Sequence, residues 1–139
     1  MRGMRSISAT VACVAACGGA TEITIENLEG TWDATAYVYT NKANTSQQVN
    51  IVTVHSATLT LVVLADGTTT STFNDGQGGT SSNSGQFTAA GTTLTLAGTT
   101  YEAELDGGNL TLTTENAEYD FDNNGSKDPA TATITLDRR

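Results

Sequence analysis

A chain of 139 residues has the length of a single domain. Fifteen acidic against six basic residues give a net charge of −9 at pH 7; such a surface repels phosphate backbones and argues against nucleic acid as a partner. Only 6% of the residues are aromatic, so the core must be built mainly from Leu, Val, Ile and Ala.

The first segment is predicted to direct export. Arg2 and Arg5 form a positive start, and Ser6–Ala16 is a mildly apolar stretch too short to span a bilayer. Val14-Ala15-Ala16-Cys17 then resembles a bacterial lipobox, in which small residues precede a cysteine that becomes the lipid-modified N-terminus. Plain secretion with an incidental cysteine is the alternative.

This reading divides the chain into a lipoprotein signal peptide at residues 1–16, a tether at 17–27 and one folded domain at 28–139. After cleavage, four basic and 15 acidic residues remain, a net charge of −11, and Cys17 has no cysteine partner for an internal disulfide. Several acyl chains on Cys17 would provide stable anchoring, whereas one chain binds a membrane only marginally. We therefore expect a protein of the bacterial cell envelope, held at the outer membrane through Cys17.

The stretch around Trp32 contains the first strong strand signal. Asn27-Leu28-Glu29 predicts one helical turn before it, and Gly30 permits a tight entry into the strand. Alternation over residues 32–39 predicts a half-buried strand. One face would carry Trp32, Ala34, Ala36 and Val38, and the other Asp33, Thr35, Tyr37 and Tyr39.

Downstream of a polar loop at residues 41–48, the chain shows strand and turn patterns with no convincing helix. Residues 49–65 are predicted to hold two strand pieces, and Asp66-Gly67 predicts a hairpin to a strand at 68–73. Residues 74–84 are almost entirely small and polar, which predicts a flexible exposed loop. Further short strands are predicted at residues 86–89, 94–96, 101–105 and 110–112.

Strands that recur about every ten residues with polar turns between them are typical of an antiparallel meander. We therefore predict an all-β fold, an antiparallel up-and-down β-barrel of about eight to ten strands, with a β-sandwich as the alternative. Closing a meander removes its edges and leaves an interior just wide enough for side chains or one small ligand.

Gly30 and Trp32 on the first strand, a run of hairpins and Arg138 on the last strand resemble the lipocalin pattern, and more narrowly the small bacterial lipocalin-like lipoproteins. In that family the tryptophan packs across the closed end of the barrel, and an arginine from the final strand stacks on it. The resemblance implies this stacked pair for Trp32 and Arg138. It covers the chain from Leu28 to the end, and the longer signatures of animal lipocalins are absent.

The sharpest local motif lies shortly before the last strand. Oxygen-bearing side chains at every second position, followed by Gly125, resemble the first half of a calcium-binding loop. The twelfth position holds Thr131 in place of the usual Glu, so calcium would bind weakly, with a dissociation constant of ~0.1–1 mM. A polar hairpin turn is the alternative. The predicted ligands are Asp120, Asp122, Asn124, Ser126 and Asp128.

The remaining ionisable residues do not form a pattern expected of an enzyme. His55 is the single histidine and is predicted to serve as a hydrogen-bonding partner within a strand, while Glu102 and Glu104 alternate with apolar residues on a solvated face. We expect a monomeric binding protein for a small apolar ligand in the barrel. The alternative is an interaction module with a solid core, and a closed apolar pocket of ~300 Å³ or more would favour binding.

Overall fold

The computed structural model describes residues 22–90, 92–96 and 98–139, and it shows an all-β protein. Within those residues the helices are the short α2 (Ile25–Leu28) and α3 (Ile51–Val54). The strands are β1 (Gly30–Asn41), β2 (Gln48–Asn50), β3 (Thr58–Val63), β4 (Thr68–Asn74), β5 (Thr80–Gln86), β6 (Thr88–Ala90), β7 (Thr93–Leu96), β8 (Thr99–Asp106), β9 (Asn109–Tyr119) and β10 (Asp128–Arg138).

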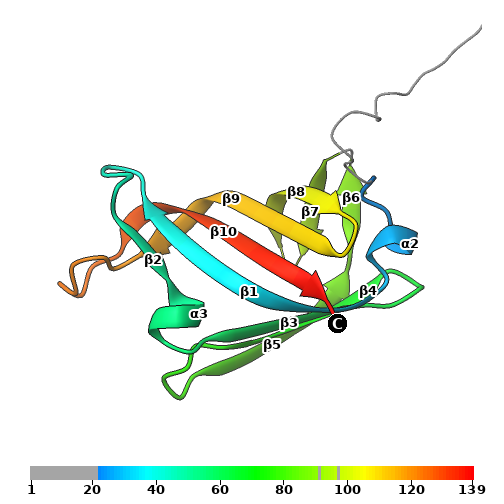
Figure 1. The fold of residues 1–139 in the computed structure, drawn as a ribbon, viewed down its shortest axis with the longest axis horizontal. Coiled ribbons are helices and arrows are strands. Elements are labelled where there is room, and N and C mark those ends of the chain that lie inside the picture. The colour runs from blue at the N-terminus through cyan, green and yellow to red at the C-terminus, as the bar shows by residue number, and fades with distance from the viewer. Residues whose placement is uncertain (1–21, 91, 97) are drawn as a thin grey trace, which may run out of the picture.

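All ten strands belong to one antiparallel sheet with the order β5-β4-β3-β1-β10-β9-β8-β7-β6, and β2 pairs with the outer half of β1. The order is a meander in which the first long strand also pairs with the last, and Figure 1 shows the sheet curling around a concave face. Among the described residues no ladder joins β5 to β6. The sheet is therefore barrel-like but open along one side, which confirms the predicted all-β antiparallel architecture.

The core lies on the concave face. Alternation on the two longest neighbouring strands places Leu110 and Leu112 of β9, and Ile134 and Leu136 of β10, in the interior. Trp32 and Leu28 are fully buried at one end of this core. Period-two patterning thus marks the interior correctly wherever a strand is regular.

The predicted faces of the first strand are wrong beyond Ala34. The register of β1 against β10 shifts between Ala34 and Ala36, so that Ala34 pairs with Leu136 whereas Tyr37 pairs with Ile134. One extra residue in a bulge reverses the side-chain parity of everything after it. Tyr37 and Tyr39 consequently face the same side of the sheet as Trp32.

Two further predictions are corrected. The loop expected at residues 74–84 contains most of β5, whose residues are all exposed yet pair in continuous register with β4. The prediction that this part of the chain has no helix is also wrong, because α3 is a short helix. The Asn50 side chain caps its first turn by accepting a hydrogen bond from the Val52 amide. The helical turn expected at residues 27–29 is present as α2, and the loop expected at 41–48 joins β1 to β2.

Candidate functional site

The structure brings Gly30, Trp32 and Arg138 together at one end of the sheet. The Arg138 guanidinium carbon lies 4.3 Å from the centroid of the Trp32 ring. The same guanidinium donates to the backbone carbonyls of Glu29 and Asn27, each at 2.6 Å, and the indole N–H donates to the Leu28 carbonyl at 2.9 Å. The last strand is therefore tied both to the indole and to the carbonyls at the end of α2.

Gly30 is required by this arrangement. Its φ of +132° lies in a region that other residues rarely adopt, and a Cβ at this position would stand 3.0 Å from Arg138 Nη1. A side chain would therefore meet the guanidinium that covers the indole. The Gly-x-Trp spacing thus reflects a close approach between the first and last strands.

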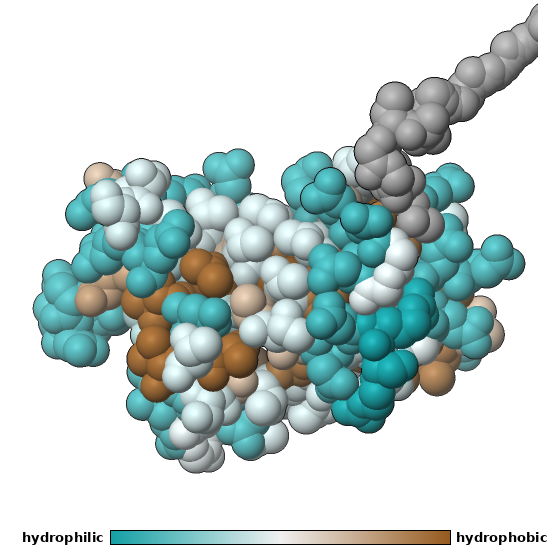
Figure 2. Space-filling model, viewed as in Figure 1, coloured by the Kyte–Doolittle hydropathy of each residue, from teal (hydrophilic) through white to brown (hydrophobic). Residues whose placement is uncertain are grey.

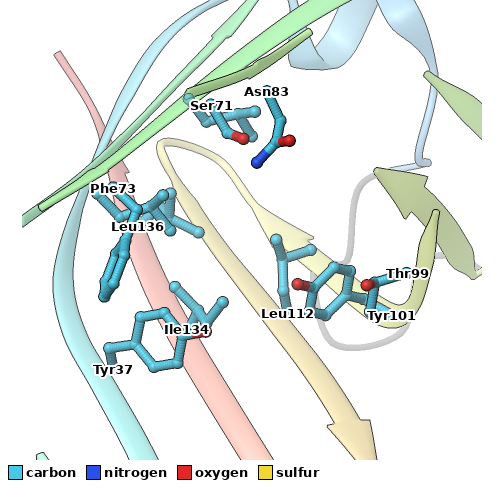
Figure 3. A pocket seen from close by; sticks show the side chains of 11 residues that line it. Tyr37, Ser71, Phe73, Asn83, Thr99, Tyr101, Leu112, Ile134 and Leu136 are labelled. Atoms are coloured by element: carbon cyan, nitrogen blue, oxygen red, sulfur yellow. The ribbon is translucent and has the colours of Figure 1, made fainter. Parts of the chain in front are cut away.

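Further along the concave face lies a partly open cavity of about 260 Å³. In Figure 3, Tyr37, Phe73, Ile134 and Leu136 stand on one side and Leu112 and Tyr101 on another. Leu59 and Leu61 of β3 complete the apolar lining, and the polar lining side chains are Ser71, Asn83 and Thr99. The cavity is somewhat smaller than the ~300 Å³ expected of a ligand pocket, but it has the expected chemistry of apolar walls and a few polar groups.

The two phenols in this cavity are neutral at ordinary pH. Burial raises the pKa of Tyr37, and the neighbouring Tyr39 raises it further. Burial likewise raises the pKa of Tyr101. Among the described residues that line the cavity there is no carboxylate, amine or guanidinium, so the cavity would accept an uncharged group and disfavour an ionised one.

A second, wider cavity of about 680 Å³ is lined by residues of α3 and of the turn between β9 and β10, which Figure 1 shows at the end of the sheet away from α2. Four segments surround it: the outer part of β1, the β2–α3 segment, the turn between β4 and β5, and the turn between β9 and β10. Phe73 lines both cavities. The wider cavity can therefore serve as the mouth of the inner one, and we refer to it below as the mouth.

A row of aromatic rings runs from the inner cavity through this mouth. Tyr37 stacks on Tyr39 with 5.2 Å between ring centroids, and Tyr39 stacks on Tyr119 at 4.9 Å. Phe121 meets Tyr119 edge to face at 5.1 Å, and Phe73 packs against Tyr37 at 5.8 Å. The bulge in β1 makes this row possible because it turns both β1 tyrosines inward.

His55 follows α3 and lines the mouth, where its Nε2 lies 3.1 Å from the Tyr119 hydroxyl. It is therefore a hydrogen-bonding partner, although it lies beside a helical turn and not in the expected strand. Glu102 and Glu104 are exposed on β8, as the alternation predicted.

The acidic motif forms the turn between β9 and β10. One oxygen from each of Asp120, Asp122 and Asp128 lies within 4.8 Å of the others. The two carboxylate oxygens of Asp120 accept from the amides of Asn124 and Gly125, at 3.1 and 2.8 Å, and the Asn124 side chain accepts from the Ser126 amide. Burial alone would raise the pKa of Asp120, but these amide hydrogen bonds outweigh it and lower the pKa.

The loop therefore holds three carboxylates together, and hard oxygen donors of this kind suit calcium. However, Asp120 and Asn124 already accept hydrogen bonds from loop amides, as they would in an ordinary turn. The geometry is compatible with both readings, and calcium binding stays a prediction.

Comparisons with protein families, with curated proteins and with solved structures find no match to this chain. In the described part of the chain, neither helix is long or apolar enough to cross a membrane. Cys17 and the signal segment lie outside the described residues.

Sequence reasoning missed the inner cavity and the aromatic row. Their residues come from β1, β3, β4, β5, β8, β9, β10 and the turn between β9 and β10, and no short motif unites them. Tyr37 and Tyr39 of β1 were the feature of the sequence that could have indicated the aromatic row. A row of aromatic residues on a supposedly solvated strand face is unusual enough to suggest that the face is covered.

Proposed function

We propose that this protein is an exported, lipid-anchored and non-catalytic binding protein of the lipocalin-like kind, which holds a small apolar ligand on the concave face of its sheet. The observation that carries the proposal is the inner cavity, where Leu61, Leu112, Ile134 and Leu136 from three different strands converge beside Phe73. A monomer contains the whole of this cavity, so the proposal needs no second copy.

The energetics favour a ligand that is largely apolar. Transfer of apolar surface out of water contributes about 25 cal/mol per Å², and Ser71, Asn83 and Thr99 at the edge of the cavity could orient one polar group. A fully polar ligand would lose its hydration without enough partners in return. The site would therefore select by shape and apolar area more than by charge.

The test is a cavity-blocking variant with a matched control. Ser71 and Thr72 are adjacent on β4, but Ser71 lines the cavity whereas Thr72 lies on the opposite, exposed face. Titration with a neutral fluorescent naphthylamine is expected to show saturable binding to the wild type and to Thr72→Phe. Ser71→Phe should weaken binding at least tenfold, and equal affinities of the two variants would contradict the proposed site.

The lipid anchor is supported by the lipobox-like Val14–Cys17 and predicts a specific modification. In cells supplied with a clickable fatty-acid analogue, the wild type should be labelled and Cys17→Ser should not. Cys13→Ser is the matched control, since the residues before Cys13 fit a lipobox poorly, and it should be labelled like the wild type. Labelling of Cys17→Ser but not of Cys13→Ser would place the lipid on Cys13.

A second candidate function is a protein-interaction module. It is favoured by an apolar patch over α3, seen in Figure 2, in which Val54 is 62% exposed. Exposed apolar side chains beside a polar rim often mark contact surfaces. If Ser71→Phe leaves naphthylamine binding unchanged and Val54→Asp abolishes it, the probe reports this patch and the second candidate is favoured.

A further inference from the structure

We propose that the natural ligand is an amphiphilic organic cation, whose apolar tail fills the inner cavity while its positively charged head lies at the mouth. This inference deepens the proposed function and rests on it. It commits the site to one class of ligand, namely quaternary ammonium ions or protonated amines that carry a short apolar chain.

The first support is that the two cavities are neighbours on the concave face. Phe73 lines both of them, and Tyr37 of the inner cavity stacks directly on Tyr39 of the mouth. The inner volume of about 260 Å³ equals that of roughly nine water molecules at ~30 Å³ each. It therefore suits a short tail and leaves any larger head group in the wider space beyond Phe73.

The second support is the difference in charge between the cavities. Among the described residues, no carboxylate, amine or guanidinium lines the inner cavity, whereas Asp75, Glu118 and Asp120 line the mouth together with the amine of Lys127. Amide hydrogen bonds from Gln77 and Gly79 lower the pKa of Asp75, so this carboxylate is ionised at neutral pH. Three carboxylates and one amine line the mouth, which would therefore repel an anionic head.

The third support is the chemistry of the walls. Tyr39 and Tyr119 stack in the mouth and Phe121 packs against Tyr119. Aromatic rings attract organic cations at any face that another ring does not cover, and in this row Tyr39 and Tyr119 cover one face of each other. Rings supply none of the oxygen ligands that calcium prefers, so the aromatic part of the mouth suits an organic cation, whereas a metal ion would be held by the carboxylates of the turn between β9 and β10.

The experiment compares three probes that share an octyl tail and differ only in the head, each measured by calorimetry below its micelle concentration. Octyltrimethylammonium should bind at least about tenfold more tightly than octyl sulfate, with neutral octyl glucoside between them. Ser71→Phe should weaken all three because the tail is excluded. A single affinity for all three heads would overturn the assignment of the cation.

A matched pair of charge variants separates the mouth from the general negative charge of the protein. Glu118 and Glu115 are both exposed on β9, but of the two only Glu118 lines the mouth. Glu118→Gln should weaken octyltrimethylammonium roughly threefold to fivefold, as expected when one nearby charge is lost close to water, and should weaken octyl glucoside by a smaller factor. Glu115→Gln should change neither.

The outcomes distinguish this inference from the proposed function. If octyl glucoside binds and Ser71→Phe blocks it, but the cation has no advantage, the apolar site stands and the cation assignment fails. An advantage that both glutamine variants reduce equally would reflect overall charge and would also overturn it. If none of the probes binds, the proposed function itself fails.

Discussion

Replacing Trp32 with Ala should lower the free energy of unfolding by about 3–5 kcal/mol, the cost expected for removing a large, fully buried aromatic side chain. Trp32 has no exposed surface, and its loss would also leave the Leu28 carbonyl without the indole N–H. At about 2–4 °C for each kcal/mol in a domain near this size, the melting temperature should fall by at least ~6 °C. Chemical denaturation followed by circular dichroism measures the effect.

Arg138 and Arg139 provide a matched comparison for this prediction. Arg138→Ala should cost roughly 0.5–2 kcal/mol because it removes the contact with the indole and two backbone hydrogen bonds. Arg139 pairs with Asp33 through side chains that are 64% and 43% exposed, and such a pair contributes only about 0–1 kcal/mol. A double-mutant cycle should couple Trp32 to Arg138 and not to Arg139, and no coupling to either would reject the stacked pair.

Millimolar calcium should raise the melting temperature by several degrees relative to chelator. At about ten times its dissociation constant, a ligand stabilises the folded state by about 1.4 kcal/mol. The physical reason is the repulsion among Asp120, Asp122 and Asp128, which a bound cation would neutralise, fixing the turn between β9 and β10.

Asp122→Asn tests whether the calcium-dependent rise in melting temperature comes from binding at the acidic triad. Asp122 is exposed, and Asp106, in the hairpin between β8 and β9, is an exposed aspartate outside the triad. The calcium-dependent shift should disappear in Asp122→Asn and persist in Asp106→Asn. Coincident melting curves of the wild type in calcium and in chelator would leave the loop an ordinary polar turn.

A strand could be predicted from the sequence when its own residues show the apolar repeat, and not when its conformation depends on pairing with a neighbouring strand. Leu110 and Leu112, like Ile134 and Leu136, repeat at period two, and burial follows that repeat directly. β5 shows no such repeat because all of its residues are exposed, including Asn83 at the edge of the inner cavity. Its strand conformation comes from the ladder to β4, which is information carried by a neighbour and not by the segment itself.

The acidic loop could likewise be predicted from the sequence, whereas the inner cavity could not. The oxygen ligands from Asp120 to Asp128 are contiguous, so a motif could find the cluster that the structure shows. The cavity depends on the single inserted residue between Ala34 and Ala36. Alternation looks equally regular with or without that bulge, so the alternation by itself did not show that Tyr37 and Tyr39 point inward.

Native mass spectrometry of the protein purified from its own host, set beside the same protein under denaturing conditions, tests the central proposal most directly. The account predicts an extra mass of a small amphiphile on the native wild type that disappears on denaturation. The same adduct should be retained by Thr72→Phe and missing from Ser71→Phe. An adduct of equal mass and occupancy on Ser71→Phe would contradict a ligand site on the concave face.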